Sequence, residues 1–263
     1  MRKFKCLLTA MLLACSTASF AQFTNGGGGG GVSSDVEAWK GLRFSYDKTF
    51  VKYDWNGAED GDMNGFSLGY VQSFKIAKKF PIFFETGLGL NFARTSEDVS
   101  WEDDIYGYSF GLKETSSTTT LGLTIPLNIV WGVKINDMLA IKPYTGFYLR
   151  VNVMSKGKYK TEVSIPSEMI NELRDWGWSQ SDIDDAVASV NENYGAGEED
   201  WSNFDEDEVG KDGKWNRCQF GWQIGATLDI KQFNVGIGYA LDFNEIAEKT
   251  KFSKFAVTVG YNF

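Results

Sequence analysis

The last ten residues of the chain read Lys254-Phe-Ala-Val-Thr-Val-Gly-Tyr-Asn-Phe263, and they decide which fold the rest of the sequence must fit. From Phe255 onwards every second side chain is apolar or aromatic, and the residues between are small or polar. Such alternation is typical of a strand with one apolar face, and about ten residues are enough for a tilted strand to cross a bilayer. A buried strand of a soluble sandwich alternates in the same way, so the other segments must decide.

Seven further segments repeat this alternation of large apolar with small, polar or charged side chains. The clearest is residues 118–134, and the others are residues 41–53, 65–76, 80–94, 139–159, 219–231 and 234–242. The chain is also rich in glycine (29) and aromatic residues (15%) and poor in proline (4), which favours long strands over helices. We therefore predict an all-β fold of eight strands.

The connections between these segments alternate between short and long. The short ones lie around residues 77–79, 136–138 and 232–233, and the long ones at 54–64, 95–117, 160–216 and 243–253. An outer-membrane barrel has this layout, with short periplasmic turns and long extracellular loops, whereas a sandwich has no reason for it. We predict an eight-stranded antiparallel up-and-down transmembrane β-barrel, whose long, partly helical third loop is extracellular.

Four stretches of the predicted strands share a pattern with known proteins. They are Leu123-Thr-Ile-Pro-Leu-Asn-Ile-Val-Trp131, Ile141-Lys-Pro-Tyr-Thr-Gly146, Val235-Gly-Ile-Gly-Tyr239 and Tyr261-Asn-Phe263. On these motifs the chain resembles, over residues 39–263, the OmpA/OmpX-like and PorT-like porin family of eight-stranded outer-membrane barrels of Gram-negative bacteria. The resemblance implies that Tyr261 and Phe263 belong to a terminal signal read by the barrel-assembly machinery.

The N-terminus has the features of a signal peptide over residues 1–21. Basic residues precede a short apolar core, and Ser19-Phe20-Ala21 fits a signal-peptidase site. A lipoprotein-type cleavage before Cys15 is the alternative, and either route exports the protein. Residues 22–38 contain six consecutive glycines and are predicted to be a flexible linker before the barrel domain at residues 39–263. We expect no peptidoglycan-binding domain after Phe263.

The composition argues against several classes of function. The sequence contains no histidine, which removes Ser-His devices and His–metal sites, so we predict neither an enzyme nor a cofactor. Only Cys218 remains after signal cleavage, so no internal disulfide can form. The net charge of −9 argues against nucleic acid as a partner.

The two faces of the predicted strands have different expected surroundings. The residues expected to face lipid are Leu123, Ile125, Leu127, Ile129, Trp222, Ile224, Val257 and Val259. The residues expected to form a polar network in the lumen are Arg43, Asp47, Glu85, Lys142, Arg150, Gln223 and Asp229. Because eight strands leave just enough room for side chains, we interpret this set as a plug of ion pairs and hydrogen bonds. A narrow path for ions is the alternative.

The third long loop, residues 160–216, carries 16 acidic and four basic residues, a net charge of −12. Ser167 is a candidate cap for a helix at 168–176, and Ser179-Gln-Ser-Asp182 has the pattern of a capping box. Asp205 and Asp207 match only part of a calcium-loop pattern, so they are a candidate weak cation site. A solvated acidic surface is the favoured interpretation of this segment.

These observations predict a non-enzymatic outer-membrane barrel with a filled lumen and a structural or surface-interaction role through its acidic loops. The expected partners are outer-membrane lipid, the barrel-assembly machinery, and an extracellular protein or ligand at the loops. A narrow channel for ions or small solutes is the first alternative. A soluble β-protein that binds a small apolar ligand is the second.

Overall fold

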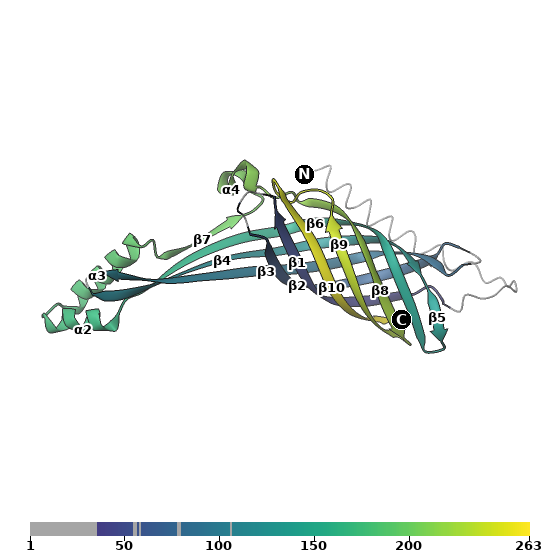
Figure 1. The fold of residues 1–263 in the computed structure, drawn as a ribbon, viewed down its shortest axis with the longest axis horizontal. Helices are drawn as coiled ribbons and strands as arrows, with labels where there is room; N and C mark the ends of the chain where they lie inside the picture. The colour runs from purple at the N-terminus through teal and green to yellow at the C-terminus, as the bar shows by residue number, and fades with distance from the viewer. Residues whose placement is uncertain (1–35, 55–56, 58, 78–79, 106) are drawn as a thin grey trace.

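The computed structural model describes residues 36–54, 57, 59–77, 80–105 and 107–263. The predicted signal peptide at 1–21 and most of the predicted linker, residues 22–35, lie outside the described residues. The remaining chain consists mainly of long antiparallel strands, with a few short helices concentrated between residues 167 and 213 (Figure 1).

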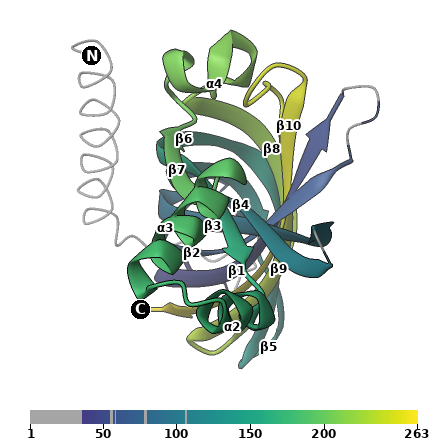
Figure 2. The same ribbon diagram turned by 90° about the vertical axis from the view of Figure 1, so that its left-hand side faces the viewer.

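Eight strands pair side by side and close into a barrel, as predicted (Figure 2). Each pairs antiparallel with both neighbours, and the pairing of β4 with β6 completes the ring. The ring strands are β1 (Lys40–Tyr53), β2 (Gly61–Lys75), β3 (Ile82–Ile105), β4 (Tyr108–Trp131), β6 (Leu139–Ser164), β8 (Cys218–Ile230), β9 (Phe233–Asp242) and β10 (Thr250–Asn262). A short strand, β5 (Val133–Asn136), follows β4 and pairs with the start of β6.

The terminal strand β10 closes the barrel between the first strand and the last hairpin. Its residues pair with β1 from Gly41↔Asn262 to Tyr53↔Thr250, without a register shift. On the other side, β10 pairs with β9 from Ser253↔Leu241 to Tyr261↔Phe233. The barrel therefore has one end with short turns, near Lys40 and Asn262, and an opposite end with long connections.

At the long-connection end, two strands extend beyond the barrel where the sequence predicts a loop. Residues 95–117 were predicted to be a loop, but β3 and β4 continue through them, paired from Thr95↔Thr118 to Ile105↔Tyr108. One face of this hairpin does carry apolar side chains, among them Trp101, Phe110 and Leu112, but Glu97 and Glu114 interrupt it, so the alternation is weaker than in the barrel strands. Outside a membrane neither face has to be apolar, and backbone pairing alone is enough to continue the strands.

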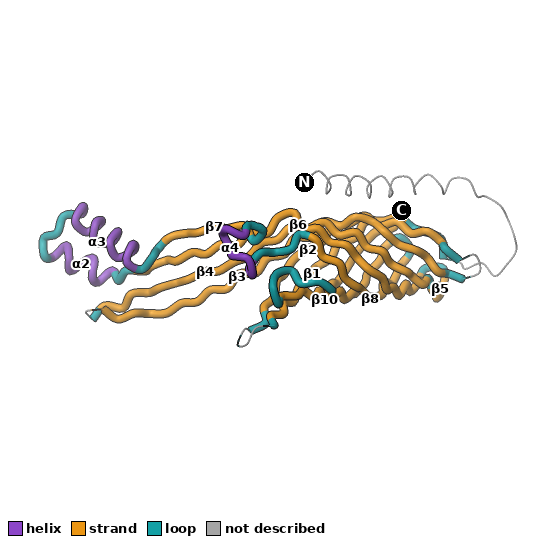
Figure 3. The backbone as a smooth tube through the Cα atoms, turned by 90° about the horizontal axis from the view of Figure 1, so that it is seen from above, coloured by secondary structure: helices purple, strands orange, loops and turns teal. Residues whose placement is uncertain are grey.

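The predicted loop at 160–216 is likewise partly regular structure. Strand β6 continues to Ser164, and β7 (Gly197–Ser202) pairs with it, from Lys156↔Ser202 to Thr161↔Gly197. The extended part of β3, β4 and β6, together with β7 and two helices at its far end, is called the arm below. Figure 3 shows the arm projecting well beyond the barrel.

The two helices of the arm are α2 (Ser167–Asp175) and α3 (Gln180–Asn193), and α4 (Glu206–Gly213) lies nearer the barrel. The capping box predicted at Ser179 is confirmed, because the Asp182 N–H donates to Ser179 Oγ (3.3 Å) and the Ser179 N–H donates to Asp182 Oδ2 (3.1 Å). The Ser179 hydroxyl (2.6 Å) and then the Ser179 N–H, both donating to Asp182 Oδ2, lower the pKa of the Asp182 carboxyl. The predicted cap at Ser167 is wrong, because Pro166 holds the N-cap position and makes no side-chain bond.

None of the helices in the described part of the chain is both long and apolar enough to cross a membrane.

The confirmed cap Ser179 and the refuted candidate Ser167 should respond differently to replacement by alanine. Replacing Ser179 with alanine should destabilise α3 by about 1 kcal/mol, because the Asp182 N–H loses its acceptor. Hydrogen exchange of the α3 amides should become about fivefold faster. Ser167→Ala is the matched control and should leave exchange in α2 unchanged. Equal effects of the two substitutions would contradict the assignment of the caps.

Candidate functional site

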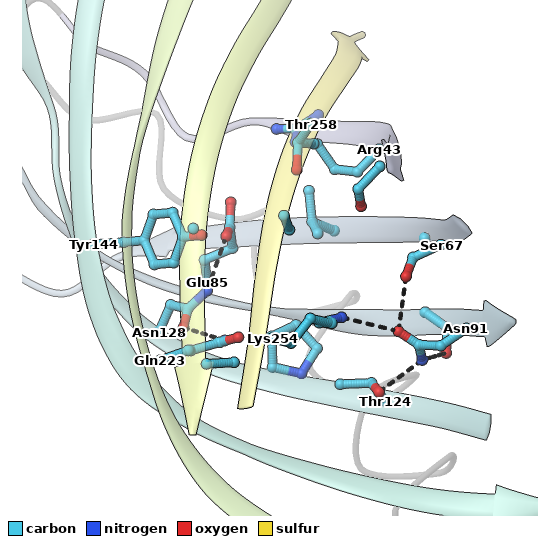
Figure 4. A pocket seen from close by; sticks show the side chains of 18 of the residues that line it. Arg43, Ser67, Glu85, Asn91, Thr124, Asn128, Tyr144, Gln223, Lys254 and Thr258 are labelled. Atoms are coloured by element: carbon cyan, nitrogen blue, oxygen red, sulfur yellow. Dashed lines mark hydrogen bonds between the residues drawn. The ribbon is translucent and has the colours of Figure 1, made fainter. Parts of the chain in front are cut away.

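The interior of the barrel holds most of the buried polar side chains, and all seven residues predicted for the lumen network lie there. Near the middle, Asp47 accepts hydrogen bonds from Ser67 and from Lys254, whose Nζ lies 3.3 Å away. Lys254 also donates to Asn91 (3.4 Å), and Asn91 donates to Thr124 (2.7 Å). Figure 4 shows the side chains from Ser67 to Thr124 linked across neighbouring strands.

A second group of bonds centres on Glu85. One carboxylate oxygen accepts from Trp39 Nε1 (2.8 Å), and the other accepts from Asn128 (3.4 Å). Gln223 donates to Asn128 Oδ1 at 2.7 Å. A cavity of about 170 Å³ remains beside these groups, lined also by Arg43, by Tyr144 and by Lys254. The bonds therefore connect β3, β4 and β8 across the lumen.

Two buried ion pairs complete the interior. Lys142 and Asp229 are 2.5 Å apart with side chains 5% and 9% exposed, and Asn262 also donates to Asp229 (3.0 Å). Arg150 pairs with Asp242 at 2.5 Å, and Asp242 also accepts from a neighbouring tyrosine, Tyr148. Pairing matters here because a buried charge without a partner is strongly destabilising.

An apolar cluster lies at each end of this polar interior. At the short-turn end, the turn-end cluster consists of Trp39, Val71, Phe83 and Val130, with Val36 and Tyr144 packed against it. At the opposite end, the arm-end cluster consists of Val51, Met63, Ile246 and Phe252, with Ala93 and Trp215 against it. Phe83 and Ile246 have no exposed surface at all. The sequence predicted the polar network but neither cluster.

The outer surface of the barrel has the opposite character. On β1, Tyr46 is 44% exposed, whereas the adjacent Asp47 is 2% exposed. Among the residues predicted to face lipid, Ile129, Ile224, Val257 and Val259 are exposed on this outer face. Leu123, Ile125, Leu127 and Trp222 occupy the same face but are half-buried, since large side chains on adjoining strands flank them.

A continuous belt of exposed apolar side chains around a polar interior is stable only where lipid covers the belt. The chain is a membrane-spanning β-barrel. Because the strands form a closed ring of eight, their backbone groups find partners within the ring, as the hydrocarbon region requires. The interior charges are shielded from lipid by the same ring.

Comparison with solved structures finds outer-membrane barrels of the OmpA/OmpX-like type. Ail, the attachment invasion locus protein of Yersinia pestis, in complex with the heparin analogue sucrose octasulfate, is 14% identical over 87% of this chain and 100% of that chain, with a TM-score of 0.34. Neisserial surface protein A is 9% identical over 85% and 97%, with a TM-score of 0.35. The N-terminal barrel of Pseudomonas aeruginosa OprF is 10% identical over 86% and 100%, with a TM-score of 0.27.

No family model matches the chain, and no curated protein matches it in sequence. The assignment of the fold therefore rests on the strand register and the side-chain distribution of this chain.

The acidic charge is concentrated on the arm and beside it, where a few lysines form ion pairs. Lys113 binds Asp98 at 2.9 Å, and this bond lowers the pKa of the Asp98 carboxyl. Lys160 binds Glu162 at 2.5 Å. Since residues 160–216 hold 16 acidic and four basic residues, the surface remains strongly negative after this pairing.

The residues of the candidate cation site have a local structural role. Asp205 is the N-cap of α4, and its carboxylate accepts from the Asp207 N–H at 3.1 Å. Among the described residues, no three His, Cys, Asp or Glu side chains group together in a way that would hold a metal ion. The weak cation site at Asp205 and Asp207 stays a prediction.

Several interior residues of the network were not among the seven predicted, and Lys254 and Trp39 are two of them. Lys254 alternates with Phe255, so the phase of the terminal strand could have placed it in the lumen. Trp39 precedes the first strand, where no alternation exists to orient it. Its indole nonetheless donates to Glu85 and lies 3.4 Å from the Lys142 ammonium, measured to the ring centroid.

The apolar outer belt predicts that a charged side chain placed there at mid-strand strongly destabilises the folded barrel. Val257→Arg, on the outer face of β10, should lower the free energy of folding into lipid vesicles by about 2–4 kcal/mol, because the guanidinium must enter hydrocarbon. Equilibrium urea titrations in vesicles measure this difference. The matched control is Val99→Arg, since Val99 is 57% exposed on the arm, outside the belt. Equal costs at the two positions would contradict the position of the membrane.

The buried Lys142–Asp229 ion pair predicts that substitutions of its two residues have non-additive effects on stability. Lys142→Met should cost about 3–5 kcal/mol, because Asp229 keeps its burial and loses its cation. The double variant Lys142→Met/Asp229→Leu should recover much of that loss, since no buried charge is left without its partner. The same urea titrations measure both variants. Additive effects would show that the two side chains do not depend on each other.

Proposed function

We propose that this protein is a non-enzymatic outer-membrane barrel that keeps its lumen closed and displays the arm outside the cell as an interaction surface. The observation that carries the proposal is the contrast between the two halves of the molecule. The barrel half has a buried apolar cluster at each end, whereas the arm half extends far from it and exposes charged and aromatic side chains (Figure 1).

The filled interior favours a closed barrel over a channel. An ion that crossed the lumen would have to pass Phe83 and Val130 at one end and Ile246 at the other, all nearly or fully buried. Between them, the charged groups Lys142, Asp229, Arg150 and Asp242 are already paired with one another. A filled lumen is also the usual outcome for eight strands.

Loop length supports an orientation with the arm outside the cell. In outer-membrane barrels the short turns face the periplasm and the long connections face the exterior. The short-turn end here also holds Lys40 and Asn262, close to both ends of the barrel domain. A signal peptide at residues 1–21 would deliver the chain to the periplasmic side.

The terminal strand supports assembly by the barrel-assembly machinery. Tyr261 and Phe263 are 38% and 64% exposed at the end of β10, the strand that closes the ring. They therefore offer an aromatic signal on the outer face before lipid covers it.

The absence of histidine from the whole sequence argues against hydrolase and acyltransferase chemistry.

Orientation can be tested with two cysteine variants in a Cys218→Ser background. Ser181→Cys places a thiol on α3 of the arm, and Asp137→Cys places one in the turn between β5 and β6. In intact cells, a membrane-impermeant maleimide should label only the first. After cell lysis it should label both. Labelling of the second alone in intact cells would reverse the proposed orientation.

Closure of the lumen can be tested by electrical recording. The purified barrel in planar bilayers should show no sustained conductance, because buried apolar clusters block both ends. Co-migration of the folded protein with outer membranes and a heat-dependent shift in gel mobility would establish that the sample is the native barrel. Sustained conductance of that native sample would favour the alternative of a narrow channel for ions or small solutes.

A further inference from the structure

An apolar groove lies at the far end of the arm, between the tip of the β3–β4 hairpin and the helices α2 and α3. Its volume is about 590 Å³, within the range of about 300–1,000 Å³ that is typical of ligand pockets. Residues from three separate stretches of sequence line it, including Phe110, Met169, Leu173, Trp176, Val190 and Tyr194.

The floor of the groove is fixed, and its rim is open. Phe110 and Leu173 are 4% and 7% exposed, and the ring of Phe110 stacks on that of Tyr194 with centroids 6.3 Å apart. Trp176 lies at the rim with 70% of its surface exposed. Outside the membrane, an exposed tryptophan beside a preformed apolar pocket marks a surface that binds a partner.

One carboxylate gives the groove a polar contact point. Glu172 Oε2 accepts a hydrogen bond from the Tyr108 hydroxyl at 2.5 Å, which ties α2 to the tip of the hairpin. A phenol has an ordinary pKa of about 10 and is protonated at neutral pH, and this bond raises the pKa of Tyr108 further. The second oxygen of Glu172 remains available to a ligand.

The charge around the groove selects among ligands. Residues 167–193, which include both helices, carry seven acidic residues and one basic residue, a net charge of −6. This field attracts cations, repels anionic ligands, and opposes the approach of a second copy with the same acidic helices.

From this combination we propose that the groove binds a cationic amphipathic peptide segment, with a bulky apolar side chain in the pocket and flanking Lys or Arg side chains against Glu172 and its acidic neighbours. The apolar anchor removes the surface of Trp176 and Met169 from water. The flanking cations provide selectivity over neutral apolar molecules. This inference deepens the proposed function, since it depends on the arm being exposed to the exterior in the cell.

The test uses the full mature protein in nanodiscs of zwitterionic lipid, where binding does not depend on cellular orientation. The probe is an amidated peptide with a Leu-Phe-Leu centre and two lysines on each side, titrated by calorimetry. Trp176→Ala and Glu172→Gln should each weaken binding by about tenfold, because they remove the apolar rim and the charge in the groove. Raising the salt concentration should also weaken binding.

Matched controls separate the groove from general attraction to an acidic surface. Asp184→Asn removes the same charge as Glu172→Gln from an exposed position of α3 that does not line the groove, and it should change affinity by less than about twofold. The same peptide with glutamates in place of lysines should not bind.

Three outcomes would overturn the inference. They are equal losses for Glu172→Gln and Asp184→Asn, equal binding of the acidic peptide, or concentration-dependent self-association of the protein that Trp176→Ala abolishes. If the peptide binds as expected but cysteine labelling in cells is reversed, the groove inference stands and only the proposed orientation is wrong.

Discussion

Hydrocarbon offers no hydrogen-bond partner to a peptide group, and this constraint determines the architecture of the barrel. Every N–H and C=O of a lipid-exposed strand must be paired within the protein, so the sheet cannot end in a free edge. Strand β10 removes that edge by pairing with β9 on one side and β1 on the other. The outer belt and the inner network are consequences, because closure gives each strand one face in lipid and one in the lumen.

Closure with only eight strands then determines what the interior can hold. The lumen is narrow enough for side chains to cross it, so Lys254 on β10 meets Asn91 on β3, and Gln223 on β8 meets Asn128 on β4. Neither of these bonds joins strands that are neighbours in the ring, so they couple the ring across its axis. At the ends, where water would otherwise enter, the turn-end and arm-end clusters replace polar groups with packed apolar side chains.

The part of the molecule that is constrained by lipid is the part that could be predicted from the sequence. Alternation placed the eight strands and the lumen residues such as Asp47, because a lipid-facing side chain must be apolar and its neighbour need not be. That rule ends outside the membrane. In residues 95–117, Glu97 and Glu114 interrupt the apolar face that holds Trp101 and Phe110, so this segment was predicted to be a loop although its backbone pairs. The groove was not foreseen, because Phe110 and Tyr194 meet only through tertiary packing. The capping box at Ser179, in contrast, could be predicted, because its hydrogen bonds lie within one helical turn.

The sheet of the arm has an open edge, which ring closure removes in the barrel. Beyond Arg94, β3 pairs with β4 but no longer with β2, so one edge of the arm sheet presents peptide groups to water. Such an edge can pair with another chain, and charged side chains are a common protection against this. Glu97, Asp98, Glu102 and Asp104 lie along this edge strand. The acidic composition therefore has a structural reason that is independent of any ligand. The same negative charge opposes self-association through the exposed Trp176 and its apolar groove, since copies of like charge repel each other.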